Sequence, residues 1–350
     1  MTESSSISSE SGGLTLRSWR FEDKARLENL KIVELSEPVP GPGEALVQVR
    51  ACSLNFRDLT VARGGYGRAV KVPLVPLSDG AGEVLAIGPG VTRVKPGDRV
   101  AAIFMQRWLD GDVDDSKSAS ALGGAIDGML AERVCLSADG LVRFPDHLAF
   151  EEAAALPCAA VTAWNALFRS GRLRPGESVL IQGTGGVSVF ALQFAKMAGA
   201  RVIATSGSDA KIERLRAMGA DETINYKTTP EWDKRVRELT GGAGVDHVVE
   251  VGGAGTLPLS IRAVRRAGHI ALIGVLSGAG EIDPRLILLK SIRVQGILVG
   301  SREMFEEMNR AIALSGLRPV VDRVFEFEEA VDALRYLESG AHFGKVCIRI

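Results

Sequence analysis

Short apolar runs separated by turn-forming residues fill this 350-residue chain, and their spacing changes near residue 150. In the first part, residues 44–52 alternate apolar and polar side chains, and similar short runs cover residues 80–87 and 99–104. Pro-Gly turns separate these runs, which is typical of an all-β or barrel-like module. We also expect a strand pair within residues 14–35 and a short helix that begins near Asn55.

The second part of the chain alternates apolar runs with segments of helical period. We predict strands over residues 178–182, 201–205, 245–251, 269–273 and 290–300. Strands that alternate with helices of this length favour a parallel sheet with right-handed crossovers. Small residues follow several of these strands, at the edge where an open parallel sheet binds its ligand. The length of the chain and its two patterns together indicate two domains.

A glycine cluster at residues 183–186 lies between a predicted strand and a helix predicted over residues 187–198. This arrangement directs backbone N–H groups and the positive end of a helix at a phosphate. Gly183 and Gly185 occupy the first two positions of a G-x-G-x-x-G fingerprint, but Ser188 stands at the third. A tight turn alone would also use glycine, so it is the surrounding alternation of strands and helices that favours a dinucleotide site.

Charge and composition narrow the possible partners. The chain carries 42 basic and 43 acidic side chains with no long run of either sign, which argues against nucleic acid or an anionic membrane as the main partner. No stretch approaches 18 uninterrupted apolar residues, so we expect no membrane span. Residues 1–13 lack the parts of a secretory signal and read as a flexible lead-in. The four cysteines are scattered, and we expect buried thiols in a reducing cytoplasm.

Five segments, in this order and spacing, resemble the motifs of one enzyme superfamily. They are Ala51-Cys-Ser-Leu-Asn-Phe-Arg-Asp58, Asp79-Gly-Ala-Gly-Glu83, Lys95-Pro-Gly-Asp-Arg-Val100, Leu156-Pro-Cys-Ala-Ala-Val-Thr-Ala-Trp164 and Gly183-Thr-Gly-Gly-Val187. From about Leu14 onward, the chain resembles the medium-chain dehydrogenase/reductase superfamily, in its zinc-free quinone oxidoreductase-like branch.

The resemblance implies an α/β protein of two domains with the active site between them. Residues 14–150 and 301–350 would form a GroES-like catalytic domain, a distorted β-barrel. Residues 151–300 would form a Rossmann domain, a doubly wound parallel sheet. Many relatives are dimers or tetramers joined through the last Rossmann strand, so we expect a homodimer through Ile292 to Val299.

The resemblance also predicts that no metal is bound. Zinc-dependent relatives hold a catalytic ion at positions that correspond here to Asn55, to Ser78 and Asp79, and to Cys158. One thiol and one amide do not supply the three protein ligands that catalytic zinc needs. The structural-zinc lobe of the family carries four cysteines, and residues 104–128 carry none. The histidines read as loop or strand-edge positions without ligand spacing; they are His147, His247, His269 and His342.

The end of the second Rossmann strand favours NADPH over NADH. An acidic residue there usually accepts from the ribose 2′-OH of NAD, and Ser206 stands in its place. Lys211 follows on the next helix, and Tyr226 matches a family position near the adenosine phosphate. A missing carboxylate and an added ammonium both favour a 2′-phosphate. NAD stays open, because Lys211 can be a solvated helix residue and Asp209 lies nearby.

The resemblance assigns roles to individual residues. The cofactor-binding positions would be Gly183, Thr184, Gly185, Gly186, Val187, Ser206, Lys211, Tyr226, Gly252, Gly274, Val275 and Gly344. Asn55 would lie beside the nicotinamide and donate to a substrate oxygen, or cap the helix that begins there, and both roles can hold together. Tyr66 would donate a hydrogen bond or a proton from a cleft loop, with surface packing as the alternative. Thr162 would lie beside the nicotinamide.

These assignments favour an NADPH-dependent oxidoreductase that reduces a small molecule, namely a quinone, an enone or another activated C=C or C=O compound. A polarised acceptor accepts hydride without a Lewis acid, because its own carbonyl spreads the developing charge. The alternatives are an NAD(P)-dependent alcohol dehydrogenase and a non-catalytic dinucleotide-binding relative. Residues 107–128 and 277–285 would shape the substrate pocket, the first as a surface loop that is either a lid or an ordinary excursion.

Overall fold

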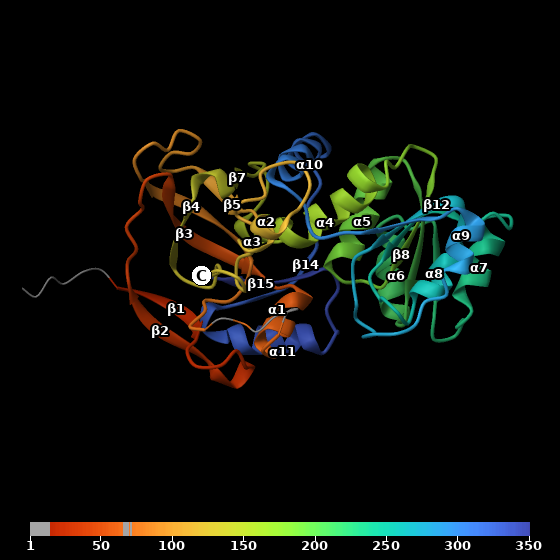
Figure 1. The fold of residues 1–350 in the computed structure, drawn as a ribbon, viewed down its shortest axis with the longest axis horizontal. Coiled ribbons are helices and arrows are strands. Elements are labelled where there is room, and N and C mark those ends of the chain that lie inside the picture. Colours follow the sequence, from red (N-terminus) through yellow and green to blue (C-terminus); the bar gives the residue numbers. More distant parts are fainter. Residues whose placement is uncertain (1–14, 66–69, 71) are drawn as a thin grey trace, which may run out of the picture.

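A computed structural model describes residues 15–65, 70 and 72–350, which form two lobes joined by a helical segment (Figure 1). In the first lobe the strand order is β14-β15-β3-β4-β5-β7, with β6 paired to the other end of β3. The strands are β3 (Glu44–Ser53), β4 (Asp79–Ile87), β5 (Arg99–Ala102), β6 (Arg133–Ser137), β7 (Leu141–Arg143), β14 (Val321–Phe325) and β15 (Lys345–Arg349). The last two strands of the chain therefore complete the sheet to which β3 belongs.

The predicted strand pair near the N-terminus is confirmed. Strands β1 (Thr15–Phe21) and β2 (Leu30–Ser36) pair antiparallel beside the larger sheet. The helical elements of this lobe are η1 (Leu27–Asn29), α1 (Phe56–Ala62), η2 (Ala138–Gly140), η5 (Phe327–Glu329) and α11 (Ala330–Glu338). They cover a core in which alternate residues of β3, among them Val47 and Val49, are almost completely buried.

The second lobe is a parallel sheet in the order β10-β9-β8-β11-β12-β13, which confirms the doubly wound fold. Its strands are β8 (Ser178–Gln182), β9 (Arg201–Ser206), β10 (Glu222–Asn225), β11 (Val245–Glu250), β12 (Val264–Leu272) and β13 (Arg293–Gly296), and its helices are α5 (Gly186–Met197), α6 (Asp209–Ala217), α7 (Trp232–Leu239), α8 (Leu257–Ala263) and α9 (Arg285–Lys290). The strand order reverses between β8 and β11, so a ligand crevice is expected at the carboxyl ends of these two strands.

The last strand of this sheet is shorter than the sequence predicts. Residues 290–300 were expected to be extended, but β13 covers only Arg293–Gly296. Helix α9 occupies the residues before it and ends at Ser291, whose φ of 52° lies in the left-handed region. The turn that reverses the chain there uses residues that would otherwise have extended the strand.

The segment that joins the lobes is helical but irregular. It runs through α3 (Phe150–Ala154), η3 (Leu156–Ala160), α4 (Val161–Trp164) and η4 (Asn165–Ser170), and both η3 and η4 are π-helical. Pro157 lacks a backbone N–H, so a regular α-helix cannot pass through it with every hydrogen bond made. Widened helical turns of this kind occur frequently at functional sites.

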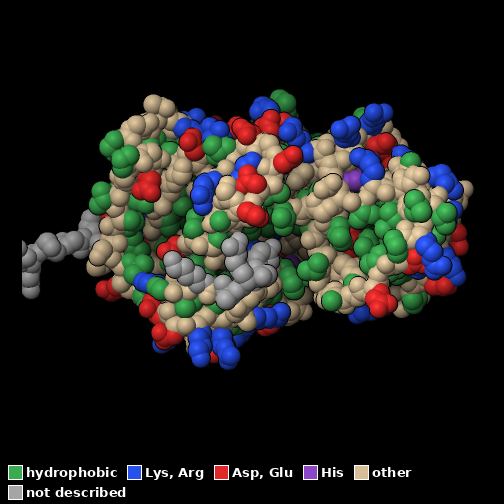
Figure 2. Space-filling view, viewed as in Figure 1, with side chains coloured by type: hydrophobic (Ala, Val, Ile, Leu, Met, Phe, Trp, Pro, Cys, Tyr) green, Lys and Arg blue, Asp and Glu red, His purple; other side chains and the backbone are tan. Residues whose placement is uncertain are grey.

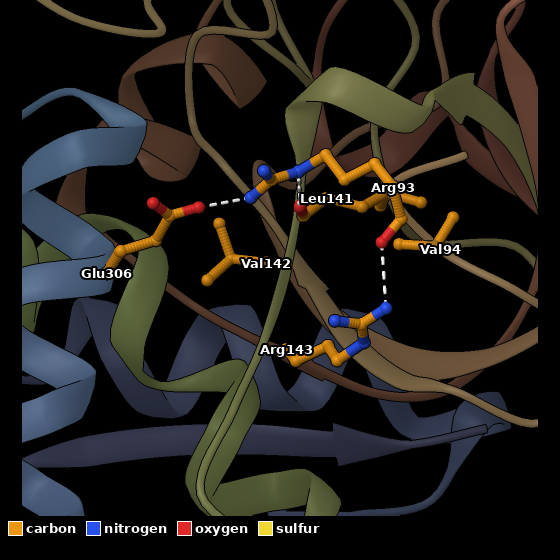
Figure 3. Close-up of a pocket in the computed structure, with 6 residues that line it drawn as sticks. All are labelled: Arg93, Val94, Leu141, Val142, Arg143 and Glu306. Carbon is orange, nitrogen blue, oxygen red and sulfur yellow. Dashed lines mark hydrogen bonds and ion pairs between the residues drawn. The ribbon is translucent and has the colours of Figure 1, made fainter. Parts of the chain in front are cut away.

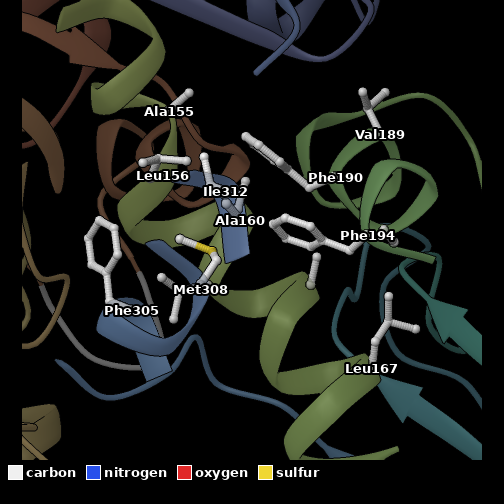
Figure 4. Packing of buried hydrophobic residues seen from close by; sticks show 14 of the residues in the cluster. Ala155, Leu156, Ala160, Leu167, Val189, Phe190, Phe194, Phe305, Met308 and Ile312 are labelled. Carbon is white, nitrogen blue, oxygen red and sulfur yellow. The ribbon is translucent and has the colours of Figure 1, made fainter. Parts of the chain in front are cut away.

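Helix α10 (Arg302–Ser315) packs against the joining segment. Its side chains Phe305, Met308 and Ile312 lie against Leu156, Ala160 and their neighbours from α5 (Figure 4). The loop at residues 106–128 is tied to the start of α10, because Arg302 N donates to Trp108 O at 2.9 Å. The surface-loop prediction is wrong for Trp108, which is buried, although the acidic tip that precedes α2 (Asp115–Ser118) is exposed.

Charged side chains of both signs are interspersed on the face seen in Figure 2, with apolar side chains between them. None of the helices in the described part of the chain combines the length and the apolar character that a membrane span requires.

Helix α10 provides a matched test of this packing. Ile312 is 0% exposed and Leu314, two residues later, is 90% exposed. We expect Ile312→Ala to lower the free energy of unfolding by about 2–5 kcal/mol, because it removes buried methyl groups and leaves a cavity. Leu314→Ala should change it by less than about 0.5 kcal/mol. Urea unfolding of the two variants measures the difference, and equal effects would contradict the packing described.

Candidate active site

The glycine turn lies at the carboxyl end of β8, at the point where the strand order reverses. Gly183 has a φ of +71°, and Gly185 is the N-cap of α5. No atom lies within 4 Å of the position that a Cβ atom would take at either glycine, so the first turn of α5 is open to a phosphate. Ser188, at the third fingerprint position, donates its hydroxyl to Gln182 O at 2.7 Å, which satisfies this buried side chain. The turn therefore fits a dinucleotide.

The last strand of the chain lies directly against this turn. Gly344 N donates to Thr184 O at 2.9 Å, across the boundary between the lobes. A Cβ atom at Gly186 would come within 2.6 Å of Lys345 Cδ, so only glycine leaves room for the lysine side chain. Val187 follows in the first turn of α5 and packs against the core shared by the two lobes.

The end of β9 brings together two of the three residues predicted near the adenosine phosphate. Ser206 is buried, and Tyr226 N donates to its carbonyl oxygen at 3.1 Å. Lys211 is turned toward the C-terminal part of the chain, where its Nζ donates to the carbonyls of Gly340 at 2.7 Å and His342 at 2.8 Å. Asp209 accepts from the Asn225 amide at 2.7 Å.

A buried carboxylate that the sequence analysis missed organises the end of β11. Glu250 accepts from the N–H groups of Gly252 at 2.8 Å and Gly253 at 3.0 Å, and from the Gln182 amide at 2.8 Å. It thereby holds the turn after β11 beside the end of β8. The signal in the sequence was an acidic residue that follows two valines at the end of a predicted strand. Gly274 N donates to the carbonyl oxygen of the same glutamate at 3.2 Å, and Val275 is exposed.

Asn55 stands at the N-cap of α1, but its side chain makes no capping hydrogen bond. Its Oδ1 instead accepts from Lys345 Nζ at 2.6 Å, and the same ammonium donates to Leu54 O at 2.6 Å. The Asp58 carboxylate accepts from Asn55 N at 2.7 Å and takes over the stabilisation of the helix start. Asn55 is 8% exposed, and its Nδ2 has no hydrogen-bond partner. The position at the helix start is thus confirmed, while the side chain is committed elsewhere.

Asp79 and Cys158 lie beside this group. The Asp79 carboxylate accepts from Ser78 Oγ at 2.7 Å and from Cys158 N at 3.0 Å. Burial raises the pKa of Asp79, against the opposing effects of the Lys345 ammonium, of the hydrogen bonds from Ser78 and Cys158 N, and of the Asn55 amide, which faces this carboxylate. Burial, and then the Asp79 carboxylate, raise the pKa of the Cys158 thiol, so the thiol stays protonated near neutral pH.

This donor set does not fit a catalytic zinc ion. Zinc takes a thiolate, an imidazole or a carboxylate as a ligand, whereas the position of the first ligand holds the amide of Asn55. A lysine ammonium already lies against the Asn55 amide and would repel a second cation. Within residues 15–65, 70 and 72–350, no three or more His, Cys, Asp or Glu side chains gather as a metal site would require. All four cysteines are free.

Two of the histidines differ from their prediction as loop or strand-edge residues. His247 and His269 are buried in the neighbouring strands β11 and β12, with their Nδ1 atoms 3.5 Å apart. His247 Nε2 lies 3.0 Å from a Glu177 carboxylate oxygen, and burial lowers the pKa of His269 to about 4. The pair borders a polar cavity of about 270 Å³ at the amino ends of the strands, opposite the glycine turn.

A further cavity of about 210 Å³ lies between β7 and α10 (Figure 3). An ion pair between Arg93 and Glu306 borders it, and Arg143 donates to Arg93 O at 2.8 Å. None of the residues predicted for the active site lines this cavity. We therefore regard the cavity as a gap in the packing of β7 against α10.

The remaining catalytic candidates are Thr162 and Tyr66. Thr162 is buried in α4, within the irregular segment that joins the lobes. Tyr66 lies outside the described residues.

Comparisons with known proteins agree with this architecture. The family model described as "alcohol dehydrogenase GroES-like domain" matches residues 41–146, and the family model described as "zinc-binding dehydrogenase" matches residues 186–314. A zinc-type alcohol dehydrogenase-like protein of Schizosaccharomyces pombe is 44% identical over 346 residues, which cover 96% of this chain and 100% of the relative.

Two solved structures share the fold. An NAD-dependent alcohol dehydrogenase has a TM-score of 0.87 and 36% identity, with 95% of this chain and 99% of that one covered. The 2-octenoyl-CoA carboxylase reductase CinF, in complex with NADP and 2-octenoyl-CoA, has a TM-score of 0.85 and 28% identity, with 96% and 87% covered.

The GroES-like lobe and the parallel-sheet lobe define a dinucleotide-binding oxidoreductase with a GroES-like domain and a Rossmann domain. The chain belongs to the medium-chain dehydrogenase/reductase superfamily and is an NAD(P)-dependent oxidoreductase.

The burial of Asp58 predicts how the free energy of unfolding depends on pH. Burial raises the pKa of Asp58 to about 6, although Arg57 and the Asn55 N–H oppose the shift. The folded protein therefore binds this proton more tightly than the unfolded chain does, where the pKa is about 4. The contribution of Asp58 to stability is fully present below pH about 4 and is lost as pH rises to about 6.

We expect the free energy of unfolding of Asp58→Asn, relative to the unsubstituted protein, to rise between pH 4 and pH 6. The slope of this difference is at most ~1.4 kcal/mol per pH unit, because one proton is involved. Urea unfolding at pH 4, 5 and 6 measures it. A difference that stays constant across this range would contradict the assignment.

Proposed function

We propose that the protein is a zinc-independent, NADPH-dependent oxidoreductase that reduces a quinone, an enone or another activated C=C or C=O compound by hydride transfer. The observation that carries the proposal is the cluster at the positions of the zinc ligands. There, a buried amide is held by a lysine ammonium, and its Nδ2 has no partner. Such a group can donate a hydrogen bond to a substrate oxygen, although it cannot supply a Lewis acid.

The glycine turn and the ends of β9, β11 and β12 would hold the dinucleotide, whose reduced nicotinamide supplies hydride. In the proposed reaction the chain binds and orients the acceptor, with Asn55 Nδ2 donating to its carbonyl oxygen. Thr162 would face the nicotinamide, and Tyr66 is our candidate for the proton donor. The negative charge that reaches the acceptor oxygen is spread through its conjugated system, which lessens the need for a metal.

An alkene activated by a carbonyl group has support from a relative. The structure of CinF contains NADP together with 2-octenoyl-CoA, an enoyl thioester of the kind that can accept hydride at carbon. In this chain, the polar groups of the cluster would meet the carbonyl oxygen of such an acceptor.

The second candidate is an NAD(P)-dependent alcohol dehydrogenase, which the names of the Schizosaccharomyces pombe relative and of the NAD-dependent structure favour. Without a metal, alcohol oxidation requires a general base that can reach the hydroxyl. Asp79 is the carboxylate of the cluster, but its oxygens are occupied by Ser78 and Cys158 N. The cluster therefore supports reduction of an activated acceptor more than oxidation of an alcohol.

Replacement of Asn55 tests the role of the amide. We expect Asn55→Ala to lower kcat by about 10²-fold, the loss typical of a positioned donor, with the dinucleotide Kd changed by less than about threefold. Asn309→Ala is the matched control, because Asn309 is also a buried amide but donates to Arg143 O in the contact between α10 and β7. Stopped-flow oxidation of NADPH with a panel of quinones, enones, aldehydes and alcohols measures the effect.

Metal content is measured on the same sample. The proposal expects turnover with quinones or enones and less than about 0.1 zinc per chain. Near-stoichiometric zinc that is lost on chelation together with activity would overturn it. Turnover of alcohols alone would favour the second candidate.

NADPH is the proposed cofactor, since Ser206 offers no carboxylate to the ribose and Lys211 lies in the first turn of the next helix, α6. The Lys211 ammonium donates to two carbonyl oxygens of the C-terminal part of the chain, and a 2′-phosphate would be a further acceptor for it. We expect Lys211→Met to raise the Kd of NADPH about tenfold and to leave the Kd of NADH unchanged. Fluorescence titration with both dinucleotides measures this, and equal effects on the two would argue against a 2′-phosphate contact.

We propose a homodimer formed through β13 and its surroundings, within the predicted stretch Ile292 to Val299. Exposed apolar side chains gather around this edge strand; they are Val275, Leu276, Leu286, Leu288, Leu289 and Leu298. Apolar side chains are also visible over the end of the molecule that carries α9 (Figure 2). An unpaired strand edge beside such a patch favours pairing with a second chain.

Light scattering of the protein should give twice the mass of one chain. We expect Leu288→Glu to shift it toward the monomer, because a charge would be buried at the contact. Leu314→Glu, on exposed α10 surface, is the control and should not. A monomeric parent protein would exclude the dimer.

A further inference from the structure

Lys345 has a placement that the family assignment does not explain. It is the first residue of β15 in the first lobe, yet it is only 3% exposed and its aliphatic chain crosses over Gly186 in the second lobe. Its ammonium donates to Asn55 Oδ1 and to Leu54 O, both at 2.6 Å. A buried ammonium is unfavourable unless its surroundings compensate the charge, so the site must gain something from holding it.

The chemistry of the ammonium fixes how the Asn55 amide points. An ammonium group donates hydrogen bonds and cannot accept one, so the atom of the amide that faces it must be the oxygen. The amide nitrogen is then directed away from Lys345. Nδ2 is buried and has no partner in the described structure. A buried donor without a partner is unfavourable, and an acceptor atom brought by a ligand would relieve the cost.

The charges around the ammonium are balanced. Lys345 acts on the carboxylates of Asp58 and Asp79, lowering the pKa of each against the larger effect of burial. Arg57 is the second cation of this group and lies 3.5 Å from an Asp58 oxygen. Two buried carboxylates thus face two cations, and Lys345 is the cation closest to the Asn55 amide. Its charge also favours a neighbouring atom that gains negative charge.

We propose that Lys345 is a positioning residue for the reduction: it holds the Asn55 amide with Nδ2 turned toward the acceptor oxygen, and it supplies the fixed positive charge beside that donor. This inference rests on the proposed function and identifies what replaces the metal. The backbone of β15 adds to the arrangement, since Gly344 N binds Thr184 O in the dinucleotide turn. Strand β15, which carries Lys345, would therefore fix the position of the Asn55 amide relative to a bound dinucleotide.

The test compares single and double variants. Lys345→Met keeps an aliphatic chain over Gly186 and removes the ammonium. We expect kcat to fall about 10²-fold, as for loss of a positioned donor, while the dinucleotide Kd changes by less than about threefold in a fluorescence titration. Asn55→Ala combined with Lys345→Met should fall no further than Asn55→Ala alone, because Lys345 acts through the amide. Lys345→Arg, which restores a cationic donor, should recover part of the loss.

Lys290→Met is the matched control. Lys290 Nζ also donates to backbone carbonyls, those of Ile261, Arg262 and Val264, and the described structure shows no contact between it and the crevice. We expect a lower melting temperature and an unchanged kcat for this variant. A readout independent of turnover is the double-mutant cycle of Asn55 and Lys345 in the free energy of unfolding, which should show coupling between the two side chains.

Three results would overturn the inference. An unchanged kcat in Lys345→Met would show that the ammonium only stabilises the fold. A dinucleotide Kd raised more than about tenfold at constant kcat would make Lys345 a phosphate ligand. Additive losses of kcat in the double variant would show that Lys345 does not act through Asn55. Failure of the proposed function would give a different result. The unsubstituted protein would then show no NADPH oxidation with any of the quinones or enones tested.

Discussion

The contact of the last β-strand with the dinucleotide turn is the constraint on which the rest of the site depends. Gly344 N bonds to Thr184 O, and the Lys345 side chain passes over Gly186 to reach Asn55. The last strand of the first lobe and the glycine turn of the second are thereby held in direct contact. In the proposed reaction, this contact would decide how a nicotinamide and the Asn55 amide face each other.

Burial makes the hydrogen bond between Lys345 and Asn55 decisive for the orientation of the amide. In water, a lysine and an asparagine would each be solvated and their mutual orientation would be weak. Here both are almost completely buried, together with Asp58 and Asp79, so every polar atom must find a partner within the protein or in a ligand. Asn55 Nδ2 is the atom of this pair that finds none. Burial also raises the pKa of the Cys158 thiol beside this group.

Much of the fold followed from the pattern of residues. The alternating runs after residue 170 could form only parallel strands with crossovers, and the glycine cluster after the first of them had to be a turn at the carboxyl edge. Errors arose where contacts distant in sequence decided the outcome. His247 and His269 looked like edge residues, yet each strand is covered on both faces. Trp108 looked like part of a surface loop, yet the start of α10 binds the backbone around it.

The sequence by itself determined the two kinds of fold, most of the order of secondary structure, the glycine turn after β8 and the residue types at the positions of the zinc ligands, because each depends on local spacing or on residue type. Only the tertiary structure decided which partner Asn55 takes and how Glu250 and Lys345 are used. The closest partners of Asn55 along the chain offered a helix cap, whereas its actual partner lies 290 residues away. Pairings over such separations are set by how the strands close into a sheet, and no local pattern encodes them.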